Sequence, residues 1–255
     1  MKIYVCVKNV PDTAANIKVI GDNGFDESVK FLINPYDEYA IEEAARLVEK
    51  EGGEVVLVTI GKESAMVTVR AALALGAHRA LLVTHDAQFI DSGDTATILQ
   101  KVMEDDGAAD LIFMGKQAVD CEAMQTSYRL AAGLGIPVAS DITEFSVSGD
   151  KVCVEREIGG GEREVVEMSM PCIVAATKGL NEPRYPKLPD VMKAKKKEVK
   201  QFTVKDLGVE LLAETEVISL EAVPERSDAK ILSGSPAEAV AELVRILKEE
   251  EKVLD

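Results

Sequence analysis

Short apolar runs alternate with segments of helical periodicity through the first 135 residues of the chain. Residues 3–8 and 54–60 are rich in β-branched residues, which is typical of strands that are buried on both faces of a sheet. Residues 37–50 repeat apolar positions with a period of about 3.6, which predicts an amphipathic helix. The same criteria predict further strands at 79–84 and 110–115 and further helices at 64–76, 95–106 and 122–135.

Single helices between successive strands require right-handed crossovers, so this pattern predicts an α/β fold with a mostly parallel, doubly wound sheet. Near residue 137 the pattern changes to strands joined by tight turns at 148–150 and 159–161, which predicts an antiparallel edge on that sheet. From residue 180 the chain is rich in Pro and Lys, and periodicity returns only in a capped amphipathic helix at 235–252. We therefore expect an α/β domain over 1–180 and an extended arm over 181–255.

Composition excludes several classes of function. The 255-residue chain carries a formal net charge of −16, which disfavours binding to a phosphate backbone and so to nucleic acid. Its four cysteines are far apart and form no CxxC pair, which argues against a disulfide framework and a zinc site. Only two histidines are present, and the sequence offers no nucleophile–base pair, so we expect no catalytic residues and no metal ligands.

Membrane association is also unexpected. The apolar run at the N-terminus is too short for the core of a signal peptide. No apolar run approaches the roughly 20 residues that a membrane-spanning helix needs. We therefore expect a cytoplasmic protein.

A candidate phosphate site lies at residues 114–120, between a predicted strand and a predicted helix. Such a loop presents free backbone amides at the positive end of a helix dipole, and doubly wound sheets bind nucleotides at this edge. The loop has neither a GxGxxG nor a P-loop motif, so an ordinary strand–helix turn remains the alternative. Asn34 and Asp37 lie where another helix of the same unit begins; they either cap that helix or line the same crevice.

A third candidate is the segment 181–197, which contains three prolines before its run of lysines. Leu188 stands between Lys187 and Pro189, so an apolar side chain is carried by a stiffened backbone. Such a residue suits a docking anchor, because little ordering entropy is lost on binding. The alternative is a solvated linker with a charge run.

Several motifs occur in one order along the chain and together carry a family resemblance. The longest is VEREIGGGEREVVEMSMPCIVA at 154–175, and the others are VKNVPDT, INPYDEYAIEEA, ALALGAHRA, GKQAVD, LNEPRY and LPDVMKAKKK. This set resembles the β-subunits of electron transfer flavoproteins over nearly the whole chain, to about residue 210. Gly159 departs from the family, which usually has Asp there; we expect this change to alter a turn rather than a site.

The resemblance implies an electron carrier subunit rather than an enzyme, with a fold like that of the adenine nucleotide α-hydrolases. The family forms heterodimers with one FAD, held mainly by the larger α-subunit, while the β-subunit holds a structural AMP. Electrons come from acyl-CoA dehydrogenases or related dehydrogenases and pass to a quinone-linked oxidoreductase. By this resemblance, residues 1–180 are the nucleotide-binding domain and 181–255 the partner-binding arm, with a docking loop and a C-terminal helix.

The resemblance also implies which residues form each site. The AMP site would consist of Cys6, Asn34, Pro35, Tyr36, Asp37, Ile60, Gly115, Lys116, Gln117, Ala118, Val119, Asp120, Cys121, Glu122, Ala123, Met124, Gln125 and Thr126. The docking loop would consist of Tyr185, Pro186, Lys187, Leu188 and Pro189.

Besides Gly159, the sequence departs from the family at three positions. Cys121 and Met124 replace residues that are often polar, so the phosphate would depend more on backbone amides. Thr13 replaces an aromatic neighbour of the flavin, whereas Tyr36 keeps the second aromatic position.

Two other functions remain open at this stage. A flavin-bifurcating member of the family would hold a second FAD in place of AMP, although GKQAVD with LNEPRY resembles the AMP type more. A stand-alone adenine-nucleotide-binding module, of the universal-stress or adenine-hydrolase type, would share the α/β core without needing a partner subunit.

Overall fold

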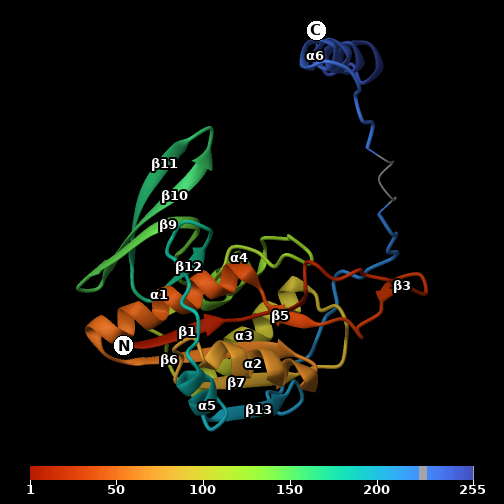
Figure 1. Cartoon of the computed structure of the whole chain (residues 1–255). Coiled ribbons are helices and arrows are strands. Elements are labelled where there is room, and N and C mark those ends of the chain that lie inside the picture. The colour runs from red at the N-terminus through yellow and green to blue at the C-terminus, as the bar shows by residue number, and fades with distance from the viewer. Residues whose placement is uncertain (224–228, 255) are drawn as a thin grey trace. The chain divides into compact units, whose positions relative to one another are not determined.

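The protein is described here from a computed structural model that covers residues 1–223 and 229–254. Within these residues nine strands form one sheet, in the order β11-β10-β9-β12-β8-β1-β6-β7-β13 (Figure 1). Their bounds are β1 Lys2–Cys6, β6 Glu54–Gly61, β7 Arg79–Thr84, β8 Leu111–Gly115, β9 Val138–Ser148, β10 Lys151–Gly159, β11 Glu162–Ser169, β12 Cys172–Ala176 and β13 Val199–Thr203.

Every neighbouring pair from β9 to β13 in this order is parallel. β10 pairs with β9 and β11 in the antiparallel sense, which confirms the predicted antiparallel edge. Two small antiparallel sheets lie outside the main one. They join β2 (Asn9–Pro11) to β5 (Phe31–Ile33) and β3 (Val19–Ile20) to β4 (Gly24–Phe25).

Helices cover both faces of the sheet, as a doubly wound fold requires. The helices of this part are α1 Pro35–Glu51, α2 Met66–Leu73 (after a 3₁₀ turn at Glu63–Ala65), α3 Ser92–Asp106, α4 Thr126–Leu134 and α5 Leu188–Ala194. Successive strand residues point to opposite faces. Val5 of β1 therefore packs in the core beneath α1 and α2, while Tyr4 packs in the core beneath α3 and α4. The predicted fold class is confirmed.

Several predicted helix bounds differ from the observed ones, and one predicted cap is not formed. The helix predicted at 122–135 begins only at Thr126, because Glu122 (φ 48°) and Met124 (φ 53°) adopt left-handed backbone conformations that a helix does not accept. The helix predicted at 64–76 ends at Leu73 in a tighter turn that leads to Gly76 (φ 126°). Residue 34 occupies the N-cap position of α1, but its side chain makes no capping hydrogen bond.

The segment after residue 180 contains structure that the sequence pattern did not predict. α5 packs against α2, and β13 continues the parallel sheet beside β7. Residues 204–220 then follow the body of the fold. The carboxylate of Asp94 accepts hydrogen bonds from the N–H groups of Leu212 (2.8 Å) and Ala213 (2.9 Å). The division of function between 1–180 and 181–255 stays a prediction.

The chain divides into two compact units, Met1–Leu220 and Glu221–Asp255. The second unit carries α6 (Pro236–Arg245), which continues as a π-helical turn at Ile246–Glu250. Ser235 and Glu238 form a capping box at the start of α6, which confirms the predicted capped helix. None of the helices in residues 1–223 and 229–254 combines the length and apolar character that crossing a bilayer requires.

A polar network ties the sheet to α3 at the amino ends of the strands. The Asp106 carboxylate at the end of α3 accepts hydrogen bonds from Arg79 Nη2 (2.7 Å) and from the Tyr4 hydroxyl (2.9 Å), and Lys2 Nζ lies 2.8 Å away. Burial acts to raise the pKa of Asp106, but these donors outweigh it and hold that pKa well below its usual range. The carboxylate is therefore the shared acceptor of three strand residues.

We expect Asp106→Asn to lower the free energy of unfolding by about 1–3 kcal/mol at pH 7, because the amide leaves these buried donors incompletely paired. Urea denaturation of the purified protein measures this difference. Asp105→Asn is the matched control, since its carboxylate pairs with Lys101 on an exposed helix face, where a pair contributes about 0.5 kcal/mol or less. Equal losses in the two variants would contradict the assignment.

Candidate functional site

The carboxyl ends of β1 and β8 form a topological switch point. The two strands are neighbours in the sheet. The chain leaves β1 through α1 toward β6, and it leaves β8 through α4 toward β9, which lies in the opposite direction along the strand order. The two crossovers diverge on opposite faces, and this is where doubly wound sheets form their ligand-binding crevice. Cys6 is the last residue of β1 and Gly115 the last residue of β8, so the predicted site residues lie at this point.

The Asn34 side chain joins the two predicted halves of the site. Its Nδ2 atom donates to the Gln117 carbonyl (2.8 Å), and its Oδ1 atom accepts from the Val119 N–H (3.1 Å). Asn34 is 1% exposed. Residues 34–37 are therefore in direct contact with the loop that follows β8, although more than 80 residues separate them in the sequence. Residues 34–37 therefore lie at the start of α1 and contact the loop after β8, and their role in a binding crevice stays a prediction.

Asp37 provides the second link between the same segments. Its buried carboxylate accepts hydrogen bonds from the N–H groups of Lys8 (2.7 Å) and Gly115 (3.0 Å) and from Asn34 Nδ2 (2.8 Å). Burial raises the pKa of Asp37 to about 7, although the three donors act in the opposite direction. A side chain at position 115 would not fit, because a Cβ there would lie 2.4 Å from Asp37 Oδ1 and 2.6 Å from the Cβ of Tyr36.

Cys6 and Ile60 lie on the α3 and α4 side of the switch point and pack in the same core cluster. Burial, and to a lesser degree the charge of Asp37, raises the pKa of the Cys6 thiol above its usual range. A thiol of this kind stays protonated and is not a nucleophile. Together the two residues offer an apolar wall with backbone groups at the strand ends.

Residues 116–125 form an irregular loop in which Lys116 and Asp120 are paired with other side chains of the protein. Lys116 Nζ lies 2.9 Å from Asp141 Oδ1 and 5.5 Å from the centre of the Tyr36 ring. Lys8 Nζ lies 2.7 Å from Asp120 Oδ2. Ala118 accepts a backbone hydrogen bond from residue 122, and residues 120–123 are exposed. The lysines here are paired with carboxylates, so an anion would meet mainly the backbone.

The start of α4 completes the crevice. Gln125 is its N-cap residue, with Oε1 accepting from the Ser92 hydroxyl at 2.8 Å, and Thr126 is its first helical residue. The N–H groups of the first turn have no acceptor within the helix. Ser127 is 2% exposed, and its Oγ atom has no hydrogen-bond partner within the described part of the chain. A buried hydroxyl without a partner costs about 1–3 kcal/mol, so this position fits a ligand that accepts a hydrogen bond.

Ser127 is the residue that the sequence analysis missed. With a helix predicted from residue 122, position 127 lies in the second turn, where a serine carries no signal. The true start at Thr126 places it in the first turn, beside the predicted phosphate-binding residues.

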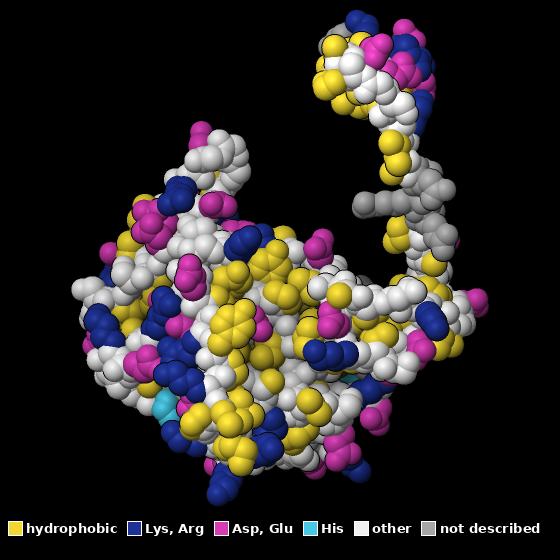
Figure 2. All heavy atoms as spheres, in the orientation of Figure 1, with side chains coloured by type: hydrophobic (Ala, Val, Ile, Leu, Met, Phe, Trp, Pro, Cys, Tyr) yellow, Lys and Arg dark blue, Asp and Glu magenta, His cyan; other side chains and the backbone are white. Residues whose placement is uncertain are grey.

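The docking residues are not part of this crevice. Residues 185–189 follow β12 and lead into α5, so Leu188 is the first residue of a short helix and not part of an irregular loop. The side chains of Tyr185 and Leu188 are 95% and 76% exposed. Apolar and basic side chains lie next to one another where Figure 1 places α5 (Figure 2). The nucleotide and docking candidates are therefore separate sites.

We expect the Asp37 carboxyl to make stability depend on pH. Its pKa of about 7 in the folded chain exceeds its ordinary value of 3.8, so the folded state binds the proton more tightly than the unfolded state. Stability from this group is therefore complete below about pH 4 and falls as the pH rises toward 7, by at most about 1.4 kcal/mol per pH unit.

Urea denaturation between pH 5 and 7.5 tests this dependence. Asp37→Asn removes the titration, so its stability should fall less steeply with pH than that of the wild type. Asp120→Asn removes an exposed carboxylate of the same loop and should keep the wild-type slope. Parallel curves for the wild type and Asp37→Asn would refute the assignment.

Comparison with known proteins identifies the family. A family model described as the electron transfer flavoprotein domain matches residues 22–207. The electron transfer flavoprotein subunit beta of Bacillus subtilis is 39% identical and that of Bradyrhizobium diazoefficiens 42% identical, each over 100% of both chains. The subunit of Mus musculus is 39% identical over 98% of this chain and 97% of its own. These matches confirm the resemblance, and the chain belongs to the electron transfer flavoprotein β-subunit family.

Proposed function

We propose that this chain is the AMP-holding, donor-docking subunit of a heterodimeric electron transfer flavoprotein. Its α-subunit partner would hold most of the FAD, which accepts electrons from an acyl-CoA dehydrogenase or a related dehydrogenase. A quinone-linked oxidoreductase would take the electrons onward. The observation that carries the nucleotide part is the crevice at the β1–β8 switch point, where Asn34 joins both predicted halves of the site.

The residues of this crevice fit an adenylate. The strand ends at Cys6 and Ile60 provide an apolar wall and backbone groups for an adenine ring. The first turn of α4 provides N–H groups at the positive end of a helix dipole, which favours a phosphate. The buried Ser127 hydroxyl and the Thr126 hydroxyl can donate to the same phosphate. AMP would be a structural ligand here, since the electron-transfer chemistry belongs to the flavin.

The exposed apolar residues fit the proposed partners. Leu188 stands at the start of α5 on a backbone that the following proline restricts, and such a residue loses little entropy when it binds. In the second unit, α6 exposes Val240, Leu243 and Val244. We assign the first surface to the donor dehydrogenase and the second to the α-subunit.

A docking loop matters because the flavin must move between partners. A donor held at Leu188 keeps the flavin at a high local concentration, so electron transfer does not wait for a new encounter. In this function the chain contributes position and binding surface and leaves the redox step to the flavin.

We expect Asn34→Ala to abolish retention of AMP, because the variant loses both contacts between the 34–37 segment and the loop after β8. The heterodimer is purified after co-expression with its α-subunit and denatured, and the released nucleotides are separated and quantified. The wild type should release about one AMP and about one FAD per heterodimer, and the variant about one FAD only.

Asn23→Ala is the control for this experiment, because Asn23 lies in an exposed turn and makes one hydrogen bond to a carbonyl at residue 217. It should retain AMP. About two FAD and no AMP per wild-type heterodimer would indicate the flavin-bifurcating type instead. A chain that is stable alone, forms a symmetric dimer and binds ATP would be a stand-alone nucleotide-binding module.

We expect Leu188→Ala to weaken reduction of the flavin by a dehydrogenase while leaving FAD content unchanged. Loss of an exposed anchor that becomes buried on docking should raise the KM of the dehydrogenase for the heterodimer by about tenfold. This KM is measured from the steady-state rate at which an octanoyl-CoA-reduced acyl-CoA dehydrogenase reduces the flavin of the heterodimer. Leu212→Ala, which removes a leucine that is 71% exposed elsewhere, should behave as wild type. Unchanged kinetics in the Leu188 variant would remove the docking hypothesis.

A further inference from the structure

We propose that Arg184 and Lys197 are positioning residues that hold the segment 185–196, which carries the docking residues 185–189, on helices α1 and α2, so that Leu188 is presented ready to dock. The proposal rests on the docking function assigned to Leu188 above. It adds two residues whose effect on electron transfer would come entirely through the position of that side chain.

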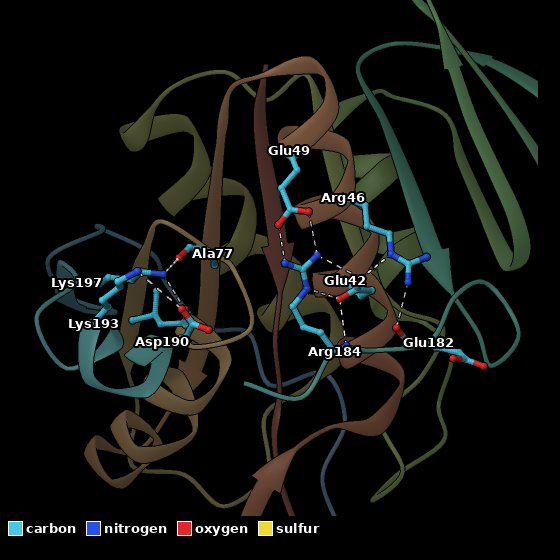
Figure 3. A network of polar contacts seen from close by, with 10 residues as sticks. Glu42, Arg46, Glu49, Ala77, Glu182, Arg184, Asp190, Lys193 and Lys197 are labelled. Carbon is cyan, nitrogen blue, oxygen red and sulfur yellow. Dashed lines mark hydrogen bonds and ion pairs between the residues drawn. The ribbon is translucent and has the colours of Figure 1, made fainter. Parts of the chain in front are cut away.

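Arg184 fixes the beginning of the segment on α1. Its guanidinium donates to Glu42 through Nε (2.7 Å) and to Glu49 through Nη1 (2.5 Å), and its backbone N–H also donates to Glu42 (3.2 Å). Figure 3 shows the guanidinium between the two carboxylates, which are two turns apart on the helix. Both the side chain and the backbone of residue 184 are thereby held, directly before Tyr185.

The acceptor of this contact is itself fixed. The Glu42 side chain is 4% exposed, and it also accepts a hydrogen bond from Arg46 Nε (2.5 Å). Arg46 Nη2 in turn donates to the Glu182 carbonyl (3.2 Å), so the chain is held on both sides of residue 183 (Figure 3). Burial acts to raise the pKa of Glu42, but hydrogen bonds from both arginines outweigh it and lower that pKa. The carboxylate therefore stays ionised at neutral pH.

Lys197 fixes the end of the segment on α2. Its Nζ atom donates to the carbonyls of Leu73 (2.9 Å), the last residue of that helix, and Ala77 (2.5 Å), in the turn that follows. Figure 3 shows the contact with Ala77. A cation at this position donates to carbonyls that receive no hydrogen bond from an N–H group of the helix, and it complements the negative end of the dipole. Arg70 of α2 donates to the carbonyls of residues 194 (2.9 Å) and 197 (2.6 Å), which holds the backbone at the same place.

Between these contacts the docking residues extend into solvent. Tyr185 is 95% exposed and Leu188 76% exposed, whereas Ala194, after them, is 1% exposed in the core. A surface hollow is bounded by both sets of contacts and lined by Glu49, Arg184, Tyr185, Lys187, Asp190 and Lys197. The segment thus has two fixed ends and an exposed middle.

This geometry affects docking because ordering a segment on binding costs entropy. A segment whose ends are already fixed has fewer conformations to lose, so more of the contact free energy appears as affinity. Arg184 and Lys197 would raise affinity without touching the donor. A purely structural role would instead change the stability of the whole chain and leave docking unaffected in the fraction that folds.

The test uses the FAD-loaded heterodimer with Lys197→Met, which keeps the apolar stem and removes the ammonium. An octanoyl-CoA-reduced acyl-CoA dehydrogenase supplies electrons. We expect KM for the heterodimer to rise about three- to tenfold, with kcat, FAD content and the rate of reduction by dithionite unchanged. Lys195→Met removes the same charge from an exposed neighbour and should match the wild type. If it raises KM equally, local charge explains the effect and the proposal falls.

A double-variant cycle separates this inference from the docking hypothesis. If Lys197 acts through Leu188, then Leu188→Ala with Lys197→Met should have the KM of Leu188→Ala alone. If the two substitutions raise KM independently, so that their effects multiply in the double variant, the positioning role is overturned and the docking role stands. A Lys197→Met heterodimer with wild-type KM would have the same consequence. A wild-type KM in Leu188→Ala would overturn both.

Glu49→Gln tests the other end of the segment and keeps the proposal testable if Lys197→Met fails to fold. Glu49 is 60% exposed at its side chain, so its substitution leaves the core intact while weakening the Arg184 contact. We expect the same change in KM at constant kcat. A wild-type KM in this variant, with Tm also unchanged, would exclude a positioning role for the contact between Arg184 and Glu49.

Discussion

The candidate site depends on the buried carboxylate of Asp37. It accepts hydrogen bonds from the backbone at Lys8, just after β1, and at Gly115, the last residue of β8, so it fixes the start of α1 against both strands of the switch point. Gly115 makes this contact possible, because a Cβ there would lie 2.4 Å from Asp37 Oδ1. A short acid at the start of α1 and a glycine at the end of β8 therefore hold the helix to the switch point.

The two ends of the sheet differ in how completely their buried polar groups are paired. At the amino end, Asp106 is fully used by donors from three strand residues, and the network closes the fold. At the carboxyl end, the described chain leaves the buried Ser127 hydroxyl without a partner at a helix start. Proteins seldom leave a buried hydroxyl unpaired unless a water, ion or ligand pairs with it. The same kind of polar network is thus complete at one end of the sheet and open at the other.

Periodicity predicted the parallel sheet, its antiparallel edge and most helices, because those elements bury regular apolar faces. It failed where backbone conformation is set by tertiary contact. The left-handed residues Glu122 and Met124 lie in a segment without Pro or Gly, so the sequence reads as helix. β13 has only five residues and is recognisable only beside β7. Motif resemblance found 34–37 and 115–126, but only the fold shows that Asn34 joins them, since no local pattern encodes a contact across more than 80 residues.

α1 links the two proposed functions physically. Its first turn, through Asp37, is part of the proposed nucleotide site, while Glu42 and Glu49 farther along the same helix hold Arg184 before the proposed docking loop. A helix moves largely as one body, because its backbone hydrogen bonds join every turn to the next. In the proposed function, an adenylate that fixes the start of α1 on the sheet therefore also helps to fix the surface on which Leu188 is presented. This gives a nucleotide without redox chemistry a physical reason to be retained in an electron carrier.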